Sequence, residues 1–138
     1  MTRVLIIDGQ GGRIGRQLAE LLMPYDGEKI ELTVVGTNAA ATANMMKSGV
    51  VRAATGENPI LVNARRADVI AGPVGIVIAD SLLGEITPAA ALAVGQSHAV
   101  KVLLPVNRCD NMVVGIRDVP LSALISEAAE EILRLAGK

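Results

Sequence analysis

Apolar residues recur along the chain in two kinds of pattern, and together these predict an α/β fold. Residues 4–7 are consecutive aliphatic residues closed by an Asp-Gly pair, the pattern of a strand buried on both faces of a parallel sheet. Residues 31–35, which end in two valines before a glycine, form the second expected strand. Between them, apolar residues return every three or four positions from Arg13 until Pro24. We therefore expect a helix between the first two strands.

The rest of the chain continues this alternation. The expected elements are an alanine-rich helix ending near residue 49, a short strand beginning at 50–51, a helix over 56–66, a strand over 68–71, a helical stretch over 76–83, a helix from 87, strands over 101–106 and 112–116, and a helix from 120. Thr87 is the expected N-cap of its helix and Pro88 the first helical residue. The final helix is amphipathic, with apolar residues along one face and three glutamates outside it.

Strands that alternate with helices predict a mostly parallel sheet with helices on both faces, joined by right-handed crossovers. We expect one domain over residues 1–138, with a doubly wound, Rossmann-like architecture. Only the polar loop 107–111 separates the last two expected strands. We therefore expect these two strands to pair antiparallel at one edge of the sheet.

Composition excludes several classes of protein. The 138 residues are 51% hydrophobic and 20% charged, which suits a globular domain. The net charge of −1 and the scattered basic residues argue against a nucleic-acid partner. Mean hydropathy is high, at +0.45, but every uncharged stretch is shorter than the roughly 18 apolar residues of a membrane span. We expect no membrane partner, a cytoplasmic location without a signal peptide, and a homo-oligomer.

The scarcity of cysteine and aromatic residues limits the chemistry further. Cys109 is the only cysteine, so the chain can form neither an internal disulfide nor a multi-cysteine metal site, and we expect no metal ion. There is no Trp or Phe and only one Tyr. A bound base would therefore lack an aromatic platform.

A glycine-rich turn follows the first expected strand directly and opens the first helix. Its residues are Gly9, Gln10, Gly11, Gly12, Arg13, Ile14 and Gly15. A mononucleotide-binding fold has its phosphate loop at this place, because glycines let the backbone approach an anion and the helix N-terminus offers free N–H donors. The alternative is that these glycines only form a tight turn between strand and helix.

The spacing of the glycines differs from the usual dinucleotide fingerprint. Ile14 stands where GxGxxG has its third glycine, and glycines at 9, 12 and 15 give GxxGxxG instead. This turn resembles those of extended short-chain reductases and of dihydrodipicolinate reductase. The resemblance implies NAD or NADP as the cofactor.

Two further positions bear on the kind of ligand. Asp8 would repel a phosphate unless its charge is offset, so it could instead hold a ribose hydroxyl or a metal, or accept N–H bonds from the turn. Gly36, Thr37 and Asn38 follow the second strand, where NAD-binding domains have an acidic residue for the ribose diol. Thr37 and Asn38 could meet a ribose or a 2′-phosphate, which leaves the choice between NAD and NADP open.

Ligands of open α/β sheets bind at the carboxyl ends of strands, which adds two loops to the candidate site. These contribute Gly72 and Pro73, and then Asn107, Arg108 and Cys109. Arg108 could clamp an anion or simply be solvated, and Asn107 could hold a carbonyl or hydroxyl group. Cys109 could act as a nucleophile only if its pKa were depressed; otherwise it is a small packing residue.

Three carboxylates remain as candidates for acid or base chemistry. Asp8 lies beside the turn, whereas Glu57 and Glu85 each stand close to the start of an expected helix. Either of the latter two could be a general base, or could serve the dipole and cap of its helix.

Six segments together resemble a family of short proteins of unknown function from anaerobic bacteria. These segments are residues 7–12, 36–38, 54–58, 72–76, 84–88 and 105–109. The resemblance covers most of the chain. It implies a Rossmann-like fold and assigns no catalytic residue.

Three functions follow from these observations. The first is a nucleotide or dinucleotide binding domain, acting as a sensor or as a subunit of an assembly, since the chain has no separate region for a substrate domain. The second is a small oxidoreductase, or an enzyme acting on a phosphorylated metabolite between the glycine turn and residues 107–109. The third is a structural oligomer without a ligand. The first two share a small phosphorylated ligand as the partner.

Overall fold

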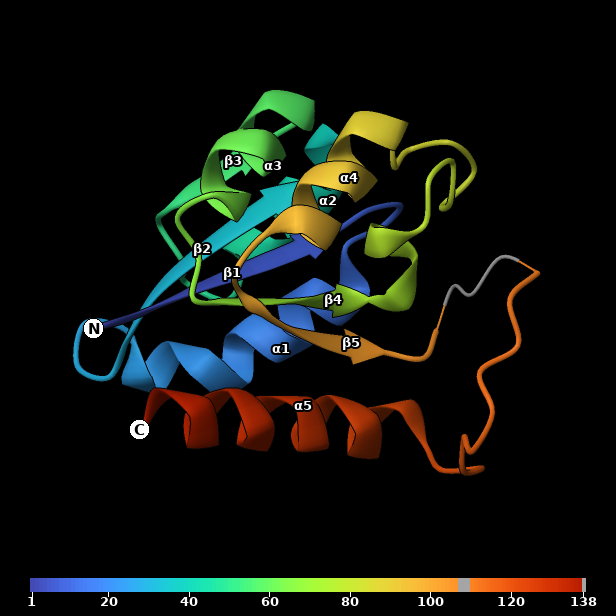
Figure 1. Cartoon of the computed structure of the whole chain (residues 1–138). Helices are drawn as coiled ribbons and strands as arrows, with labels where there is room; N and C mark the ends of the chain where they lie inside the picture. Colours follow the sequence, from blue (N-terminus) through green and yellow to red (C-terminus); the bar gives the residue numbers. More distant parts are fainter. Residues whose placement is uncertain (107–109, 138) are drawn as a thin grey trace.

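The computed structural model describes residues 1–106 and 110–137 and shows a twisted sheet between two layers of helices (Figure 1). Within these residues the strands are β1 Thr2–Asp8, β2 Ile30–Gly36, β3 Ala53–Thr55, β4 Val69–Pro73 and β5 Val100–Leu104. Their order across the sheet is β3-β2-β1-β4-β5, and all neighbouring pairs are parallel. The expected doubly wound α/β fold is confirmed.

Helices cover both faces of the sheet. Their bounds are α1 Arg13–Leu22, α2 Ala39–Met46, α3 Glu57–Ala64, α4 Pro88–Gln96 and α5 Leu121–Ala136, with 3₁₀ turns η1 Met23–Tyr25 and η2 Val74–Val77. Helices α1, α2 and α5 pack into one hydrophobic cluster, and α3 and α4 into the other. In Figure 1, α1 and α5 lie below the sheet, and α3 and α4 above it.

The central strand β1 joins these two clusters. Val4 and Ile6 point into the cluster with α1 and α5, whereas Leu5 and Ile7 point into the cluster with α3 and α4. All four side chains are at most 1% exposed. Burying each of them contributes roughly 2 kcal/mol to stability. The prediction that residues 4–7 form a strand covered on both faces is therefore confirmed.

Side-chain caps start two of the helices, and the cap at Thr87 confirms the prediction from the sequence. The Thr87 hydroxyl accepts a hydrogen bond from the N–H of Ala90 at 3.1 Å, and Pro88 is the first residue of α4. The Asn38 side chain accepts from the N–H of Ala41 at 2.8 Å and so caps α2. Each cap satisfies an N–H group that has no partner inside its helix.

The expected strand over residues 112–116, and with it the antiparallel edge, is wrong. Met112 is 93% exposed and Val114 is 98% exposed, while Gly115 has a φ of +90°. Between residue 110 and α5 the chain runs as a loop beyond the end of β5 (Figure 1). The apolar residues here pair with no strand in the described part of the chain, so strand-like composition does not produce a strand.

Three other expectations need correction. The short strand expected to begin at residues 50–51 begins later, as β3, because Val50 turns into the hydrophobic cluster with α1. Strand β4, expected over 68–71, continues through Gly72 and ends at Pro73. The helical stretch expected over 76–83 is limited to η2 and turns, because Leu82 and Leu83 have φ values of 55° and 56°, which a right-handed helix does not allow.

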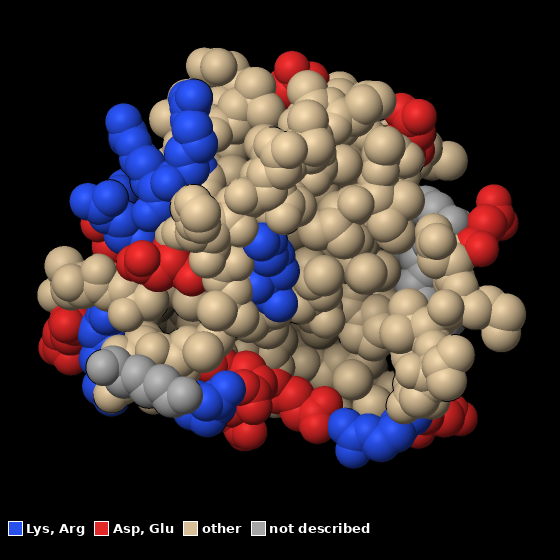
Figure 2. Space-filling view, in the orientation of Figure 1, with Lys and Arg blue, Asp and Glu red and all other residues tan. Residues whose placement is uncertain are grey.

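No described helix is long and apolar enough to cross a membrane. On the face in Figure 2, basic and acidic side chains alternate along the lower rim, and much of the centre is uncharged.

We predict that α5 is an integral part of the core, whereas the preceding loop is not. Ile132 is fully buried, so Ile132→Ala should lower the free energy of unfolding by about 3 kcal/mol through lost burial and a cavity. Val114→Ala is the control, and its effect should stay within about 0.5 kcal/mol. Urea unfolding followed by circular dichroism measures both. Equal losses in the two variants would contradict this assignment.

Candidate functional site

Loops that follow β1, β2 and β4 meet at one edge of the sheet. Strands β2 and β3 extend the sheet on one side of β1, and strands β4 and β5 extend it on the other side. The strand order therefore reverses between β1 and β4. Ligands of open α/β sheets bind in the crevice at such a switch point. The glycine turn, residues 9–15, lies there between β1 and α1.

Asp8 is buried beneath this turn, and its carboxylate holds the turn together. Its Oδ1 accepts the N–H of Gly9 and its Oδ2 accepts the N–H of Gly15, both at 2.8 Å. Burial raises the pKa of Asp8 above its ordinary value of 3.8, although these N–H bonds oppose the rise and the charge of Glu85 adds to it. Of the roles open to Asp8, the structure shows the one in which it accepts N–H bonds from the turn.

The described residues offer no metal centre. They contain no group of three or more His, Cys, Asp or Glu side chains placed to hold a metal ion.

The glycines at 12 and 15 let helix α2 pack against the turn. Gly12 is the N-cap of α1, with a φ of 71°, and a Cβ there would lie 2.5 Å from the carbonyl oxygen of Ala41. At Gly15 a Cβ would lie 2.4 Å from the Met45 sulfur. At Gly11, in contrast, it would meet no atom within 4 Å. The GxxGxxG spacing thus serves packing, whereas Gly11 marks the open side of the turn.

Two asparagines on or beside α2 fix the orientation of the peptides in the turn. Asn38 Nδ2 donates to the carbonyl of Gln10 at 3.0 Å, and Asn44 Nδ2 donates to the carbonyl of Gly11 at 2.8 Å. Because a trans peptide is planar, its N–H points away from its C=O. The N–H of Gly11 is therefore directed away from Asn38, toward the open side of the turn.

Two N–H groups of the turn make no hydrogen bond within the part of the chain that the structure describes. They belong to Gly11 and Arg13, whereas the N–H groups of Gly9, Gln10, Gly12 and Gly15 all have acceptors and that of Ile14 faces the Asp8 carboxylate. Both residues line a hollow of about 210 Å³, together with Gln17 and Leu121 at the start of α5. The side chain of Arg13 is exposed and forms no ion pair with a described residue.

Glu85 reaches this edge from the loop between η2 and α4. Its Oε1 accepts hydrogen bonds from the N–H of Gln10 at 2.9 Å, Thr37 Oγ1 at 2.5 Å and Asn38 Nδ2 at 2.8 Å. Partial burial would raise the pKa of Glu85, but these three bonds outweigh it and hold the pKa below its ordinary 4.5. Sequence reasoning had considered only a base or dipole role for Glu85. No local pattern signals its contact with the turn.

The other candidates at this edge have packing roles in the structure. A Cβ at Gly36 would lie 2.3 Å from Thr42 Oγ1, and one at Gly72 would lie 2.3 Å from the carbonyl oxygen of Ile7. Gly72 and Pro73 are buried in β4. Thr37 and Asn38 lie beside the turn as expected, but both already donate to Glu85.

Asn107, Arg108 and Cys109 lie outside the described residues, so their expected roles stay predictions. Glu57 is exposed in the first turn of α3, where a carboxylate favours the helix dipole.

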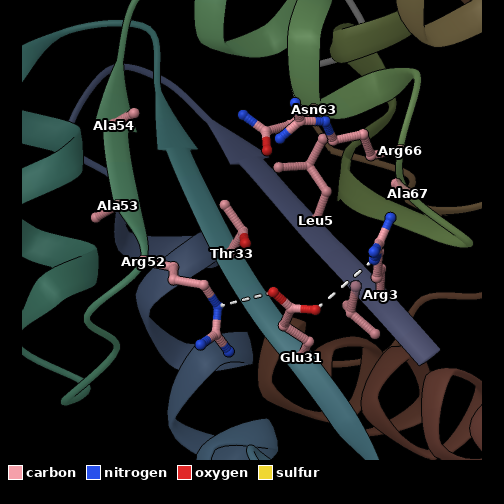
Figure 3. Close-up of a pocket in the computed structure, with 11 residues that line it drawn as sticks. Arg3, Leu5, Glu31, Thr33, Arg52, Ala53, Ala54, Asn63, Arg66 and Ala67 are labelled. Carbon is pink, nitrogen blue, oxygen red and sulfur yellow. Dashed lines mark ion pairs between the residues drawn. The ribbon is translucent and has the colours of Figure 1, made fainter. Parts of the chain in front are cut away.

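A larger hollow, of about 360 Å³, lies on the sheet face below the end of α3 (Figure 3). Glu31 lies between Arg3 and Arg52, 3.7 Å from each guanidinium, and Arg52 also pairs with Asp26 at 2.7 Å. Two of the three arginines that line this hollow thus have acidic partners. This hollow lies along the amino halves of β1 and β2, away from the glycine turn, and is separate from the candidate site.

Comparison with models of protein families identifies the family of this chain. A family model described as "Domain of unknown function (DUF3842)" matches residues 3–136. The chain belongs to this family. The resemblance of the six sequence segments to a family of unknown function is thus confirmed. A source in anaerobic bacteria stays a prediction. No curated protein sequence matches this DUF3842 chain significantly.

Solved structures similar to the DUF3842 chain include two of arsenate reductases. "An arsenate reductase in the phosphate binding state" is 17% identical, with a TM-score of 0.49, over 99% of this chain and 98% of its own. "An arsenate reductase in the intermediate state" is 13% identical over the same shares, with a TM-score of 0.44. At such values the likeness carries no information about the ligand of this chain.

We predict that Gly12 tolerates no side chain, whereas Gly11 does. Gly12→Ala combines a left-handed φ with a clash against the backbone of α2, and should cost about 3 kcal/mol of unfolding free energy. Gly11→Ala enters open space and should change it by less than about 1 kcal/mol. Urea unfolding of the two variants tests the expected order, and an equally unstable Gly11→Ala would refute it.

We also predict a pH-dependent contribution of Glu85 to stability. Because its pKa is lower in the folded chain, this contribution is present above pH 4.5 and is lost as the pH falls through the folded value. Glu85→Gln should therefore be less stable than wild type by about 1 kcal/mol at pH 7, after allowance for solvent screening, and equally stable in acid. Thermal unfolding between pH 2.5 and 7 measures the difference.

The matched control for this experiment is Glu130→Gln on α5. Glu130 is exposed and forms no ion pair with a described residue. Its unfolding curve should follow wild type at every pH. A constant gap between Glu85→Gln and wild type across the whole range would contradict the assignment.

Proposed function

We propose that this chain is a binding domain for a small phosphorylated ligand of nucleotide type, whose phosphate lies at residues 11–13. The observation that carries the proposal is the pair of N–H groups of Gly11 and Arg13, which have no partner among the described residues. They lie at the N-terminus of α1 and line a hollow on the open side of the turn.

The chemistry of these groups suits a phosphate. The N-terminus of a helix carries roughly half a positive charge, and its free N–H groups donate to anions. The Arg13 guanidinium adds up to two further donors for phosphate oxygens and a full charge. Asn38 and Asn44 fix the peptides of the turn, so the donors are oriented before a ligand arrives.

Two carboxylates restrict where a phosphate can lie. Asp8 and Glu85 already accept the N–H groups of Gly9, Gln10 and Gly15. A phosphate at those donors would have to displace a carboxylate and meet its charge. The proposed position is therefore on the α5 side of the turn, beside Gln17 and Leu121, in a hollow that Asp8 and Gly9 also line.

An enzyme acting on a phosphorylated metabolite is the alternative. Both oxygens of Asp8 accept backbone N–H bonds, so Asp8 is held in a structural role rather than left free as a base. The remaining catalytic candidates, at 107–109, lie outside the described residues. We therefore propose binding without a reaction. NAD and NADP stay the candidate cofactors, and the oligomer and the cytoplasmic location stay predictions.

We predict that Arg13→Ala weakens binding of ADP, NAD and ribose 5-phosphate by about tenfold, the loss of one charge-assisted hydrogen bond. Arg65→Ala is the matched control, because Arg65 is also exposed and unpaired among the described residues but lies after the far end of α3. Isothermal titration calorimetry with each ligand measures the dissociation constants.

A second variant tests the place of the phosphate. Gly11→Val puts bulk into space that is open in the free protein, so the chain should fold but bind these ligands at least tenfold more weakly. If Arg13→Ala and Gly11→Val bind all three ligands as tightly as wild type, the phosphate does not lie at this turn. If wild type binds none of them, the proposed function is wrong.

A further inference from the structure

Glu85 brings a carboxylate to the end of β2, where the sequence itself has no acidic residue. Thr37 and Asn38 follow this strand, and the carboxylate that both contact comes from 48 residues beyond Thr37. It lies beside the first glycine of the turn, since a Cβ at Gly9 would be 2.9 Å from Glu85 Oε1. Glu85 therefore connects the ends of the two neighbouring strands β1 and β2.

The two oxygens of this carboxylate have different surroundings. Oε1 accepts three hydrogen bonds, from Gln10, Thr37 and Asn38, and has no capacity left. Oε2 makes no hydrogen bond with any residue that the structure describes, and the side chain is partly exposed. A carboxylate oxygen has two acceptor positions. Glu85 thus presents a fixed, unused acceptor at this edge of the sheet.

Glu85 contacts the residue next to the proposed phosphate site. Gln10, which donates its N–H to Glu85, immediately precedes Gly11, whose N–H is one of the two free donors. In nucleotide-binding α/β domains, the acidic group beside the end of the second strand accepts the ribose hydroxyls while the phosphate lies at the turn. In this chain the same pair of groups is present, with the carboxylate supplied by a different loop.

We propose that Glu85 Oε2 accepts the 2′- and 3′-hydroxyls of a ribose, and that the ligand is accordingly a nucleotide with an unmodified ribose diol. This inference rests on the proposed function, since it needs a phosphate at residues 11–13. A 2′-phosphate would meet the charge of Glu85, with the buried Asp8 behind it. A 2′-deoxyribose would lose one of the two hydrogen bonds. NAD is therefore favoured over NADP, and ADP over 2′-deoxy-ADP.

The loop that carries Glu85 is built to hold it in place. Leu82 is 2% exposed in the hydrophobic cluster with α4, and Ser81 Oγ donates to the carbonyl of Gly75. The N–H of Asp80 donates to the carbonyl of Ile86 at 2.7 Å, which closes the loop. An acceptor on such an anchored loop binds a diol without first having to be ordered.

The first test needs no variant. Calorimetric titration of the wild-type chain with NAD and NADP, and with ADP and 2′-deoxy-ADP, should show at least tenfold tighter binding of the first member of each pair. Binding of NADP as tight as that of NAD, or tighter, overturns the inference.

The second test uses Glu85→Gln. The glutamine oxygen still accepts from Gln10, Thr37 and Asn38, but an amide NH₂ replaces Oε2 and the charge is lost. NAD affinity should fall about tenfold and the preference for NAD over NADP should largely disappear. Glu130→Gln, at an exposed position of α5, should keep the wild-type preference.

The outcomes separate this inference from the proposed function. Suppose that the nucleotides bind and that Arg13→Ala weakens their binding, but that Glu85→Gln does not change the preference for NAD over NADP. Only the diol contact is then wrong. If no nucleotide binds to wild type, the proposed function fails and the diol contact fails with it.

Discussion

The buried carboxylate of Asp8 is the interaction on which the arrangement of the glycine turn depends. It accepts N–H groups from both ends of the turn, Gly9 and Gly15, and so ties the last residue of β1 to the first turn of α1. With both ends fixed, and with α2 bonded to the carbonyls between them, the remaining peptides have little freedom. The donors that remain unused are a consequence of this internal bonding.

Asp8 and Glu85 show how surroundings divide two carboxylates between different tasks. Burial raises the pKa of Asp8, and both of its oxygens are taken up by the backbone. Glu85 is partly exposed, its pKa is lowered by three donors, and one oxygen remains unused. The first carboxylate is part of the architecture. The second is held by the same turn but remains open to solvent, which is the condition for meeting a ligand.

Sequence reasoning succeeded where the physics is local and failed where it is not. The aliphatic run at 4–7 and the cap at Thr87 depend on neighbouring residues, and both are in the structure as expected. Residues 112–116 have the composition of a strand but form an exposed loop, although the outer edge of β5 has no partner strand in the described sheet, so composition alone does not decide whether a segment pairs. The contact of Glu85 with the turn depends on a loop whose left-handed residues no local pattern predicts.

The exposed loop before α5 has a consequence for the covalent chain. Its backbone is accessible, with Met112 and Val114 almost fully in solvent, whereas α5 itself is anchored by Ile125 and Ile132. Exposed loops of this kind are where proteases cut. A single nick there would separate α5 covalently from the sheet while its buried face stayed in place. The nick would therefore leave two complementary fragments, one with the sheet and one with α5, that remain associated through the buried face of α5.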